Sequence, residues 1–305
     1  MRVLFTRLSA TVIVIFGVCT LVFLLLHVIP GDPIEALLGE RAQAVDQAAL
    51  RAQLGLDQPL TIQYVQYLTR LAQGDLGQSL QEQSSVTTLL AARLPATVLL
   101  AIAALTLAIG IALPLGVLAA QQHKRLLDMS AMTFSLIGLS MPNFWLGPML
   151  ILIFSLTLGW LPISGNDSPA SLILPAMTLG TGLAALLARM VRASLLEVLN
   201  EDYVRTARAK GATEWQVLWH HALRNAWLPI ITVLGLQLGG VLGGAVITET
   251  IFAWPGIGSL LVEAIKARDY PVVQGCVLLI SLIYVSVNTL TDLAYLWLDP
   301  RVRFN

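Results

Sequence analysis

Charged residues are scarce in this chain of 305 residues: they make up only 12% of it, and the formal net charge is zero. Soluble domains carry about 25% charged residues, so the composition excludes an ordinary soluble enzyme. With 18 basic and 18 acidic residues, the chain has no electrostatic footprint for nucleic acid. A disordered chain is also excluded, because disorder needs low hydrophobicity and high net charge.

Residues that carry chemistry are also few. The two cysteines, Cys19 and Cys276, lie in apolar runs, which excludes a disulfide-framed secreted domain. The four histidines form no HExxH pair, so nothing indicates a zinc protease or a haem site. An ATP-binding loop needs a lysine followed by Ser or Thr, but Lys124, Lys210 and Lys266 precede Arg, Gly and Ala. We therefore expect no catalytic residue, metal or cofactor; the chain is not an enzyme by itself, and ATP-driven work must come from partner subunits.

Long uncharged runs fill just over half of the chain. Hydrophobic residues make up 56% of it, and the mean hydropathy is +0.77. A helix needs roughly 20 apolar residues to cross a membrane, so we expect an integral membrane protein with six transmembrane helices. The third is expected at about 132–157, followed by a loop with Trp160 near the interface. The uncharged runs are 8–31, 94–123, 129–166, 168–188, 225–248 and 270–291.

The distribution of basic residues predicts the orientation. With six spans and both termini in the cytoplasm, most Lys and Arg fall on the inside, as the positive-inside rule requires. The domains expected are an N-terminal transmembrane helix at 1–30, a periplasmic subdomain at 31–95, and a five-helix core at 96–305. A cytoplasmic loop at 195–228 belongs to the core. In the periplasmic subdomain an apolar stripe at helical spacing predicts packing against the membrane domain; it comprises Tyr64, Tyr67, Leu68 and Leu71.

The fifth span carries glycines at intervals of four, with others offset by one. Small residues at this spacing let helices approach closely in lipid. The stripe predicts packing either within the chain or at a pore or subunit interface. Its members are Gly235, Gly239, Gly240, Gly243 and Gly244.

The loop between the fourth and fifth spans is too regular for a linker. Glu201 and Asp202 precede Arg205 at helical spacing, and Gly211 allows a sharp turn. A second helix is expected to end before Pro229, where the fifth span begins. It would bear one face composed of Trp215, Leu218, Trp219, Ala222 and Ala226. Two interpretations stay open: a docking element for a soluble partner, or a positive-inside loop with its Trp side chains at the lipid interface.

Motifs spread over the whole length resemble those of one family. They are HVIPGDP (27–33), LGLDQP (54–59), GDLGQS (74–79), SMPNFWLG (140–147), ETIFAWPGIG (249–258), RDYPVVQ (268–274), LDPRVR (298–303) and EDYVRTARAKGATEWQVLWHHALRNAWLP (201–229). The chain is identified as resembling an inner-membrane permease of a binding-protein-dependent ABC importer, in the oligopeptide, dipeptide and nickel branch. The resemblance implies an all-α bundle of the type I importer class in the inner membrane of a bacterium or archaeon.

In such permeases the motif at 201–229 engages the ATPase subunits. The family pattern begins with Glu-Ala-Ala six residues before the glycine, where this chain has Arg205, Thr206 and Ala207. The ATPase-coupling residues that the resemblance implies are Glu201, Asp202, Arg205, Thr206, Ala207, Arg208, Lys210, Gly211, Trp215, Leu218, Arg224 and Pro229. The helices at 203–210 and 214–227 would act as a lever.

The resemblance implies the partners and the cargo as well. The partners would be a second, homologous permease in a heterodimer, two ATP-binding-cassette ATPase subunits, a periplasmic substrate-binding protein and the lipid bilayer, with no nucleic acid. Small peptides are the expected cargo, with nickel or glutathione as alternatives. An ion-coupled secondary transporter is the alternative of another class; it is disfavoured because the span centres carry no charge.

Overall fold

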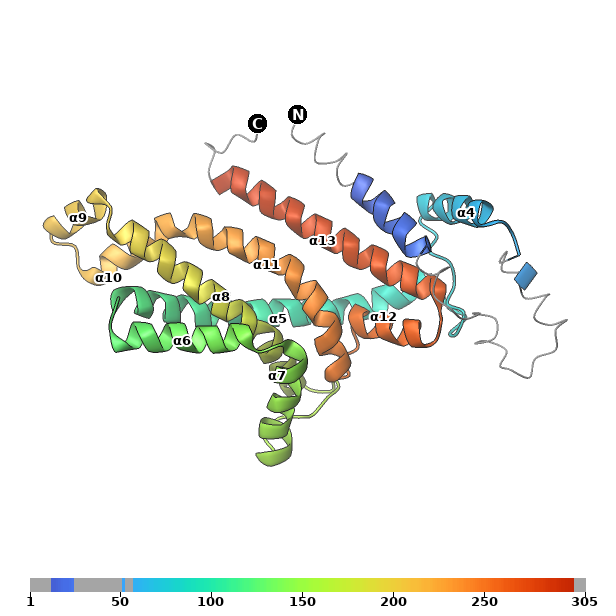
Figure 1. Ribbon diagram of the computed structural model, residues 1–305, viewed down its shortest axis with the longest axis horizontal. Coiled ribbons are helices and arrows are strands. Elements are labelled where there is room, and N and C mark those ends of the chain that lie inside the picture. Colours follow the sequence, from blue (N-terminus) through green and yellow to red (C-terminus); the bar gives the residue numbers. More distant parts are fainter. Residues whose placement is uncertain (1–11, 25–50, 53–56, 299–305) are drawn as a thin grey trace. The chain divides into compact units, whose positions relative to one another are not determined.

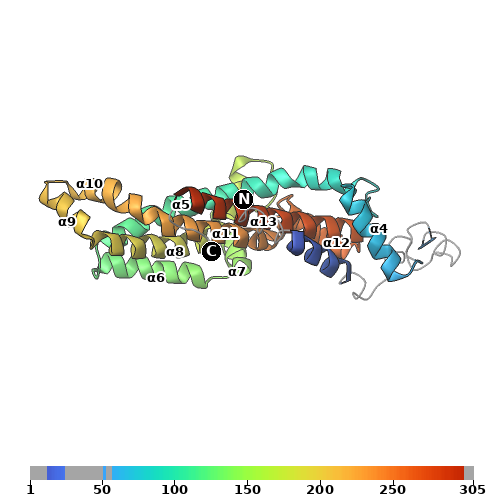
Figure 2. The ribbon, with the colours of Figure 1, turned by 90° about the horizontal axis from the view of Figure 1, so that it is seen from above.

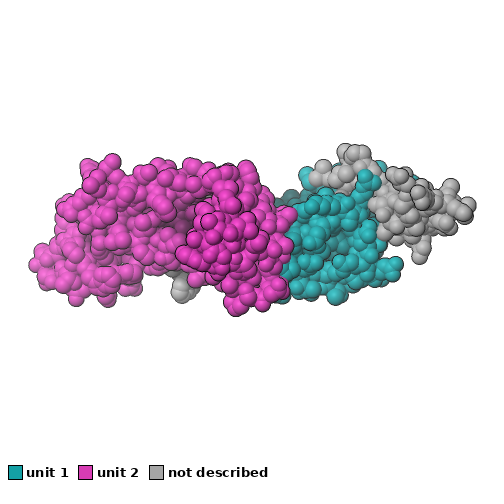
Figure 3. Space-filling view, turned by 90° about the horizontal axis from the view of Figure 1, so that it is seen from below, with its two compact units in different colours: residues 1–97, 255–285 teal, residues 98–254, 286–305 magenta. Residues whose placement is uncertain are grey.

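The computed structural model describes residues 12–24, 51–52 and 57–298; within these ranges the side chains at 228, 242, 244 and 292–298 are not described. The described residues form helices, and apart from the isolated bridge between Gln78 and Ser85 they form no β-structure. The chain divides into two compact units (Figure 3). Unit 1 comprises residues 1–97 and 255–285, and unit 2 comprises residues 98–254 and 286–305.

Unit 1 contains a short apolar helix (Val12–Leu24), α4 (Leu60–Ala72) and α12 (Ile257–Lys266). It also contains the first part of α5 (Val86–Gln121) and of α13 (Tyr270–Leu298). Its apolar core includes the fully buried Val86, Ile257 and Cys276. The predicted end of the periplasmic subdomain, at residue 95, lies within α5, which continues through residue 96 without a break.

Two tyrosines of the predicted apolar stripe on α4 contact the helix Val12–Leu24. Tyr64 forms a hydrogen bond of 2.6 Å with Thr20 on the helix Val12–Leu24. The ring of Phe23 on that helix lies 5.1 Å from the ring of Tyr64 and 5.8 Å from that of Tyr67. The tyrosines thus pack on an apolar helix, whereas packing of the whole stripe, with Leu68 and Leu71, against the membrane domain stays a prediction.

The turn between α12 and α13 contains a buried carboxylate, that of Asp269. Asp269 is 3% exposed, and its Oδ2 accepts hydrogen bonds from the Ser79 hydroxyl at 2.6 Å and from the backbone N–H of Gln81 at 3.3 Å. Its Oδ1 accepts from the backbone N–H of Val272 at 3.4 Å. Ser79 belongs to the motif 74–79 and Asp269 to the motif 268–274, so the contact joins two motifs that are distant in sequence.

Unit 2 holds the rest of α5 and of α13, and the elements between Leu126 and Ile251 (Figures 1 and 2). α6 (Leu126–Ser140) runs beside α8 (Ile173–Leu199), and α11 (Leu223–Ile251) packs on α8 as well. The shorter elements are α7 (Asn143–Leu150), the π-helix η1 (Ile151–Thr157), the 3-10 helix η2 (Pro169–Leu172), α9 (Asp202–Ala209), α10 (Glu214–Gln216) and the π-helix η3 (Val217–Ala222).

Close backbone contact joins α5 and α8. A Cβ added at Gly116 would lie 2.8 Å from the Ala188 carbonyl oxygen, and one added at Gly180 would lie 2.9 Å from that of Ala104. Side chains of α5, α8 and α11 close the core around these contacts, among them the fully buried Ala112, Ala188, Val191, Leu195, Ala226 and Ile230. Small residues thus set the distance between the helices, as expected for packing in lipid.

The third span is not the single helix predicted at about 132–157. The chain bends by 103° between α6 and the segment Asn143–Thr157. The cause is Pro142, because the ring of a proline disfavours helical dihedrals at the residue before it. Met141 accordingly has φ −85° and ψ 114°, in the extended region.

Three helices in the described part of the chain are long and apolar enough to span a membrane: Val86–Gln121, Pro169–Leu199 and Tyr270–Thr291. Two bent pairs each qualify as one more span; they are Leu126–Ser140 with Asn143–Thr157, and Pro229–Val241 with Ala245–Ile251. Val12–Leu24 is apolar but shorter, and the rest of the first uncharged run lies outside the described residues. Six spans with both termini in the cytoplasm therefore stay a prediction.

Candidate functional site

The segment after α8 folds as two short helical arms joined at Gly211. α8 ends at Leu199, and α9 follows Glu201 and ends at Ala209. Gly211 has φ +84°, a left-handed conformation that favours glycine. A Cβ added there would meet nothing within 4 Å, so only the backbone conformation requires glycine. The predicted turn at Gly211 is confirmed. Residues 201–229 are called the coupling loop below.

The second arm begins at a capping box that the sequence analysis did not identify. The Thr213 hydroxyl accepts a hydrogen bond from the Gln216 backbone N–H at 3.3 Å. The Gln216 side chain accepts in return from the Thr213 backbone N–H at 2.9 Å. A signal was present, since Thr followed by Gln three residues later is the sequence pattern of this motif.

Polar contacts join the first arm, α9, to the second arm, which consists of α10 and η3 and continues into α11. The Arg208 guanidinium makes two bonds to the Glu214 carboxylate, at 2.8 and 3.2 Å. The Asn225 amide donates to the Tyr203 hydroxyl at 2.6 Å, which joins α9 to the start of α11. These bonds therefore connect α9 with α10 and with the start of α11.

An apolar cluster lies between the arms. Val204 and Val217 are fully buried, and Ala207 packs with them. Val198 and Leu199, from the last turn of α8, contact the same cluster. The loop is therefore anchored to the end of α8 by packing as well as by chain connection.

The outer surface of the second arm carries two tryptophans. Trp215 and Trp219 are exposed by 66% and 42%, and their ring centroids are 5.2 Å apart. Leu218, Ala222 and Ala226 are instead buried, so the predicted single face is wrong. The π-helical turn at η3 changes the spacing of side chains in this arm. Aromatic side chains on the outside suit a binding surface.

The other predicted coupling residues lie on the same loop. Arg205 pairs with Asp202 at 3.3 Å, and the Thr206 hydroxyl donates to the Asp202 carbonyl at 2.9 Å. Lys210 and Arg224 are exposed. The second helix does not end before Pro229 as predicted, because Pro229 lies inside α11, which starts at Leu223. The apolar segment that qualifies as part of a bent span does begin at Pro229. Pro229 is the seventh residue of α11, so α11 continues there without the hydrogen bond that a backbone N–H at this position would donate.

The glycines of the fifth span differ from one another. A Cβ at Gly235 would collide with Thr291 on α13, so these helices touch there. At Gly240 and Gly243 an added Cβ would meet nothing within 4 Å, and Gly239 is buried. The surroundings of Gly244 lie outside the described side chains. A packing role for the stripe as a whole stays a prediction.

The sequence matches the family described as "Binding-protein-dependent transport system inner membrane component" over residues 112–304. Residues 1–101 match the N-terminal part of such membrane components. The di/tripeptide transport system permease protein DppB of Pseudomonas aeruginosa (strain UCBPP-PA14) is 45% identical over 97% of each chain. The glutathione transport system permease protein GsiC of Escherichia coli (strain K12) is 43% identical over 98% of this chain and 97% of its own.

Two solved structures share the fold. A chain of an amino acid ABC transporter, in a crystal structure with histidines, covers 68% of this chain and 94% of its own, with TM-score 0.55 and 16% identity. A chain of the inward-facing MetNI methionine ABC transporter covers 69% and 96%, with TM-score 0.58 and 20% identity. At these identities the likeness concerns the fold alone.

Proposed function

Since this chain belongs to the family of binding-protein-dependent transport system inner membrane components, and is the inner-membrane permease subunit of an ABC importer, we propose that it carries small peptides. The cargo is argued from the relatives. One is a di/tripeptide permease and the other a glutathione permease. Glutathione is itself a tripeptide, so the two names agree on a short peptide backbone.

The partners proposed are those that a binding-protein-dependent importer needs: a second permease in a heterodimer, two ATPase subunits and a periplasmic binding protein. The absence of a phosphate-binding sequence around the lysines supports ATP hydrolysis by separate subunits.

The topology proposed has six spans, a periplasmic segment at 31–95 and a cytoplasmic loop at 195–228. Labelling of single cysteines at positions 75 and 210 from either side tests it; equal accessibility from one side would contradict it.

The coupling loop is the proposed docking element for an ATPase. The observation that supports this proposal is a helical loop whose two arms are joined by hydrogen bonds and whose surface exposes Trp215 and Trp219. Trp is enriched among residues that dominate binding energy. Because bonds and packing join the two arms, we expect them to move as one lever with the ATPase.

The cargo is tested with the purified complex and its binding protein. Dipeptides, tripeptides, glutathione and chelated nickel are added in turn, and ATP hydrolysis is measured. Stimulation by the peptides or by glutathione supports the proposal, whereas stimulation by nickel alone would overturn the choice of cargo. Uptake that continues without ATP and fails without an ion gradient would overturn the mechanism.

The docking role is tested at Gly211. A Gly211→Val substitution forces a β-branched residue into a left-handed conformation, so the turn must change. We expect loss of ATPase co-purification or of the coupling between hydrolysis and uptake. Gly74→Val is the matched control: Gly74 has φ +77° and no neighbour within 4 Å of an added Cβ, but it lies in unit 1. Normal assembly and uptake in Gly211→Val, or equal defects in both variants, would contradict the role.

A further inference from the structure

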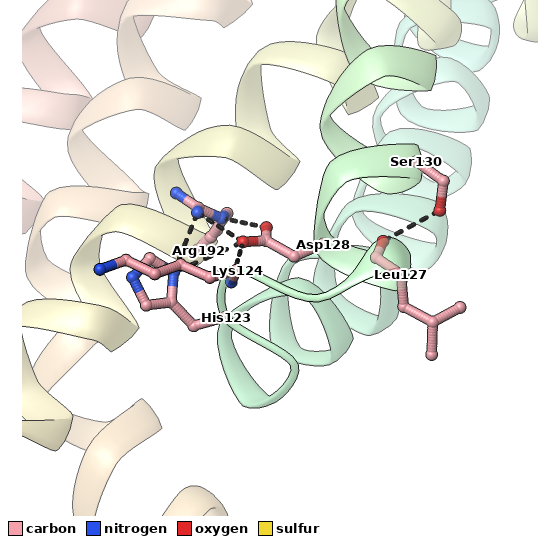
Figure 4. Close-up of polar contacts among 6 residues, drawn as sticks. All are labelled: His123, Lys124, Leu127, Asp128, Ser130 and Arg192. Atoms are coloured by element: carbon pink, nitrogen blue, oxygen red, sulfur yellow. Dashed lines mark hydrogen bonds and ion pairs between the residues drawn. The ribbon is translucent and has the colours of Figure 1, made fainter.

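A buried carboxylate lies at the start of α6, outside the coupling loop. Asp128 is 3% exposed, and Arg192 on α8 binds both of its oxygens (Figure 4). The Arg192 Nε donates to Oδ1 at 2.5 Å, and Nη2 donates to Oδ2 at 2.7 Å. Two parallel bonds between a guanidinium and a carboxylate fix geometry as well as distance. The pair therefore sets how α6 lies against α8 at this end.

The turn between α5 and α6 is folded onto the same carboxylate. Lys124 has φ +62°, and its backbone N–H donates to Asp128 Oδ2 at 2.9 Å. The Nδ1 atom of His123 lies 3.4 Å from that oxygen and 3.2 Å from Arg192 Nη2. Asp128 thus joins the end of α5, the start of α6 and the body of α8.

The rest of the contact of α6 is made by small residues. Its buried residues repeat at helical spacing along one stripe, from Asp128 through Ala131 and Ser135 to Gly138. A Cβ at Gly138 would lie 3.3 Å from Thr181 of α8, so small residues form the second point of contact. The opposite face of α6 is exposed, as at Phe134. Within this stripe Asp128 is the one charged residue.

α8 connects this pair to the coupling loop. Residues 192–199 contain neither glycine nor proline and are helical throughout. Leu199, which packs in the apolar cluster of the loop, lies about 10 Å along the helix axis from Arg192. A displacement of the loop therefore reaches Arg192 through a short, stiff helix.

From these contacts we propose that Asp128 and Arg192 are positioning residues that make α6 follow α8 when the coupling loop moves. The inference rests on the proposed docking role of that loop. At its far end α6 stops at Ser140, where the chain bends by 103° into α7. A movement of α6 consequently reorients the segment 143–157. Without the pair, no charged contact among the described residues of α6 holds it to α8, and we expect α6 to move less than α8.

The test uses the assembled complex in lipid nanodiscs with a dipeptide-loaded binding protein. The readout is the ratio of stimulated to basal ATP hydrolysis, which does not depend on how much complex folds. Asp128→Asn keeps the size and one acceptor but removes the charge, and Arg192→Lys keeps the charge but not the paired bonds. Arg189→Gln removes a charge from an exposed position one turn earlier on α8.

We expect Asp128→Asn to lower the ratio about tenfold, within the usual range of coupling between sites. Arg192→Lys lowers it less, and Arg189→Gln keeps the wild-type ratio. A proportional fall in basal and stimulated rates in Asp128→Asn, with the ratio unchanged, would overturn the inference, because the pair then only stabilises the fold. If the wild type itself is stimulated by no ligand, the proposed function fails and the inference fails with it.

Discussion

Two arginine–carboxylate pairs in unit 2 lie in opposite environments. In the pair of Asp128 with Arg192 the side chains are 5% and 23% exposed, whereas in the pair of Glu214 with Arg208 they are 66% and 39% exposed. Both make two bonds, so the geometry is similar and the solvent differs. Water and salt screen the exposed pair but reach the buried one much less.

The difference in exposure determines how easily each ion pair can open. Opening the exposed pair replaces its bonds with hydrated ones, so the coupling loop can adjust when a partner binds. Opening the buried pair leaves a carboxylate that is 5% exposed without its cation, which is strongly unfavourable. A pair that opens easily suits a docking surface, and a pair that resists opening suits a contact that transmits movement between helices.

The largest effect on stability is expected for Arg192→Gln. It leaves the buried Asp128 carboxylate without its arginine, with the Lys124 backbone N–H and His123 beside it, so we expect a loss of about 3 kcal/mol. Thermal unfolding of the purified protein in detergent measures it, with Arg189→Gln as the control. The double variant Asp128→Asn with Arg192→Gln should recover part of the loss. If the single variant unfolds at the temperature of the control, burial does not strengthen this pair.

A buried carboxylate with uncharged donors sharpens the comparison. Among the described residues, those that donate to the Asp269 carboxylate are Ser79, Gln81 and Val272, and none carries a charge. Asp269→Asn keeps one acceptor, so we expect a smaller loss, about 1.5 kcal/mol. Glu263→Gln, on an exposed carboxylate of α12, serves as the control in the same unfolding measurement. A loss as large as that of Arg192→Gln would show that burial alone, rather than the cation, decides the effect.

The next effect concerns the coupling loop itself. Thr213→Ala removes the cap of the second arm, at an expected cost of about 1 kcal/mol. Hydrogen exchange at the Gln216 amide should accelerate about fivefold, because local opening governs its protection. Thr213→Ser retains the hydroxyl and should exchange at the wild-type rate. Equal exchange in Thr213→Ala would mean that the cap does not order the arm.

The smallest effect is expected for Glu214→Gln, on the exposed pair. We expect a change of about 0.5 kcal/mol or less in local stability. It should vanish in 1 M salt, where charges are screened within roughly 3 Å, whereas the effect of Arg192→Gln should remain. Hydrogen exchange of the loop amides at low and high salt measures both. An effect of Glu214→Gln that survives high salt would erase the distinction between the two pairs.

Much of the fold follows from local sequence patterns. Among the described residues most of each uncharged run is helical, because a helix satisfies its own backbone groups in lipid. The turn at Gly211 was predictable because a glycine between two helical patterns indicates a left-handed residue. The family was predictable from motifs distributed along the chain.

Other features depend on information that local patterns do not carry. The bend after Ser140 is signalled only by Pro142, and a proline inside an uncharged run also fits a continuous span, as Pro229 within α11 shows. The contact of Asp128 with Arg192 joins residues that 63 others separate, so it depends on how α6 packs on α8. The predicted face that begins at Trp215 is divided between exposed and buried residues because η3 is a π-helix, and the spacing of apolar residues in the sequence does not reveal a π-helix.

Gly116 and Gly180 make the α5–α8 pair an internal reference for spectroscopy. At each glycine the backbone of one helix lies directly against a carbonyl oxygen of the other, so neither helix can slide without a collision. Paired probes on these two helices within unit 2 should keep a constant separation through the transport cycle. Probes on α6, α9 or α11 can then be measured against that constant distance, which separates true displacement from rotation of the whole molecule.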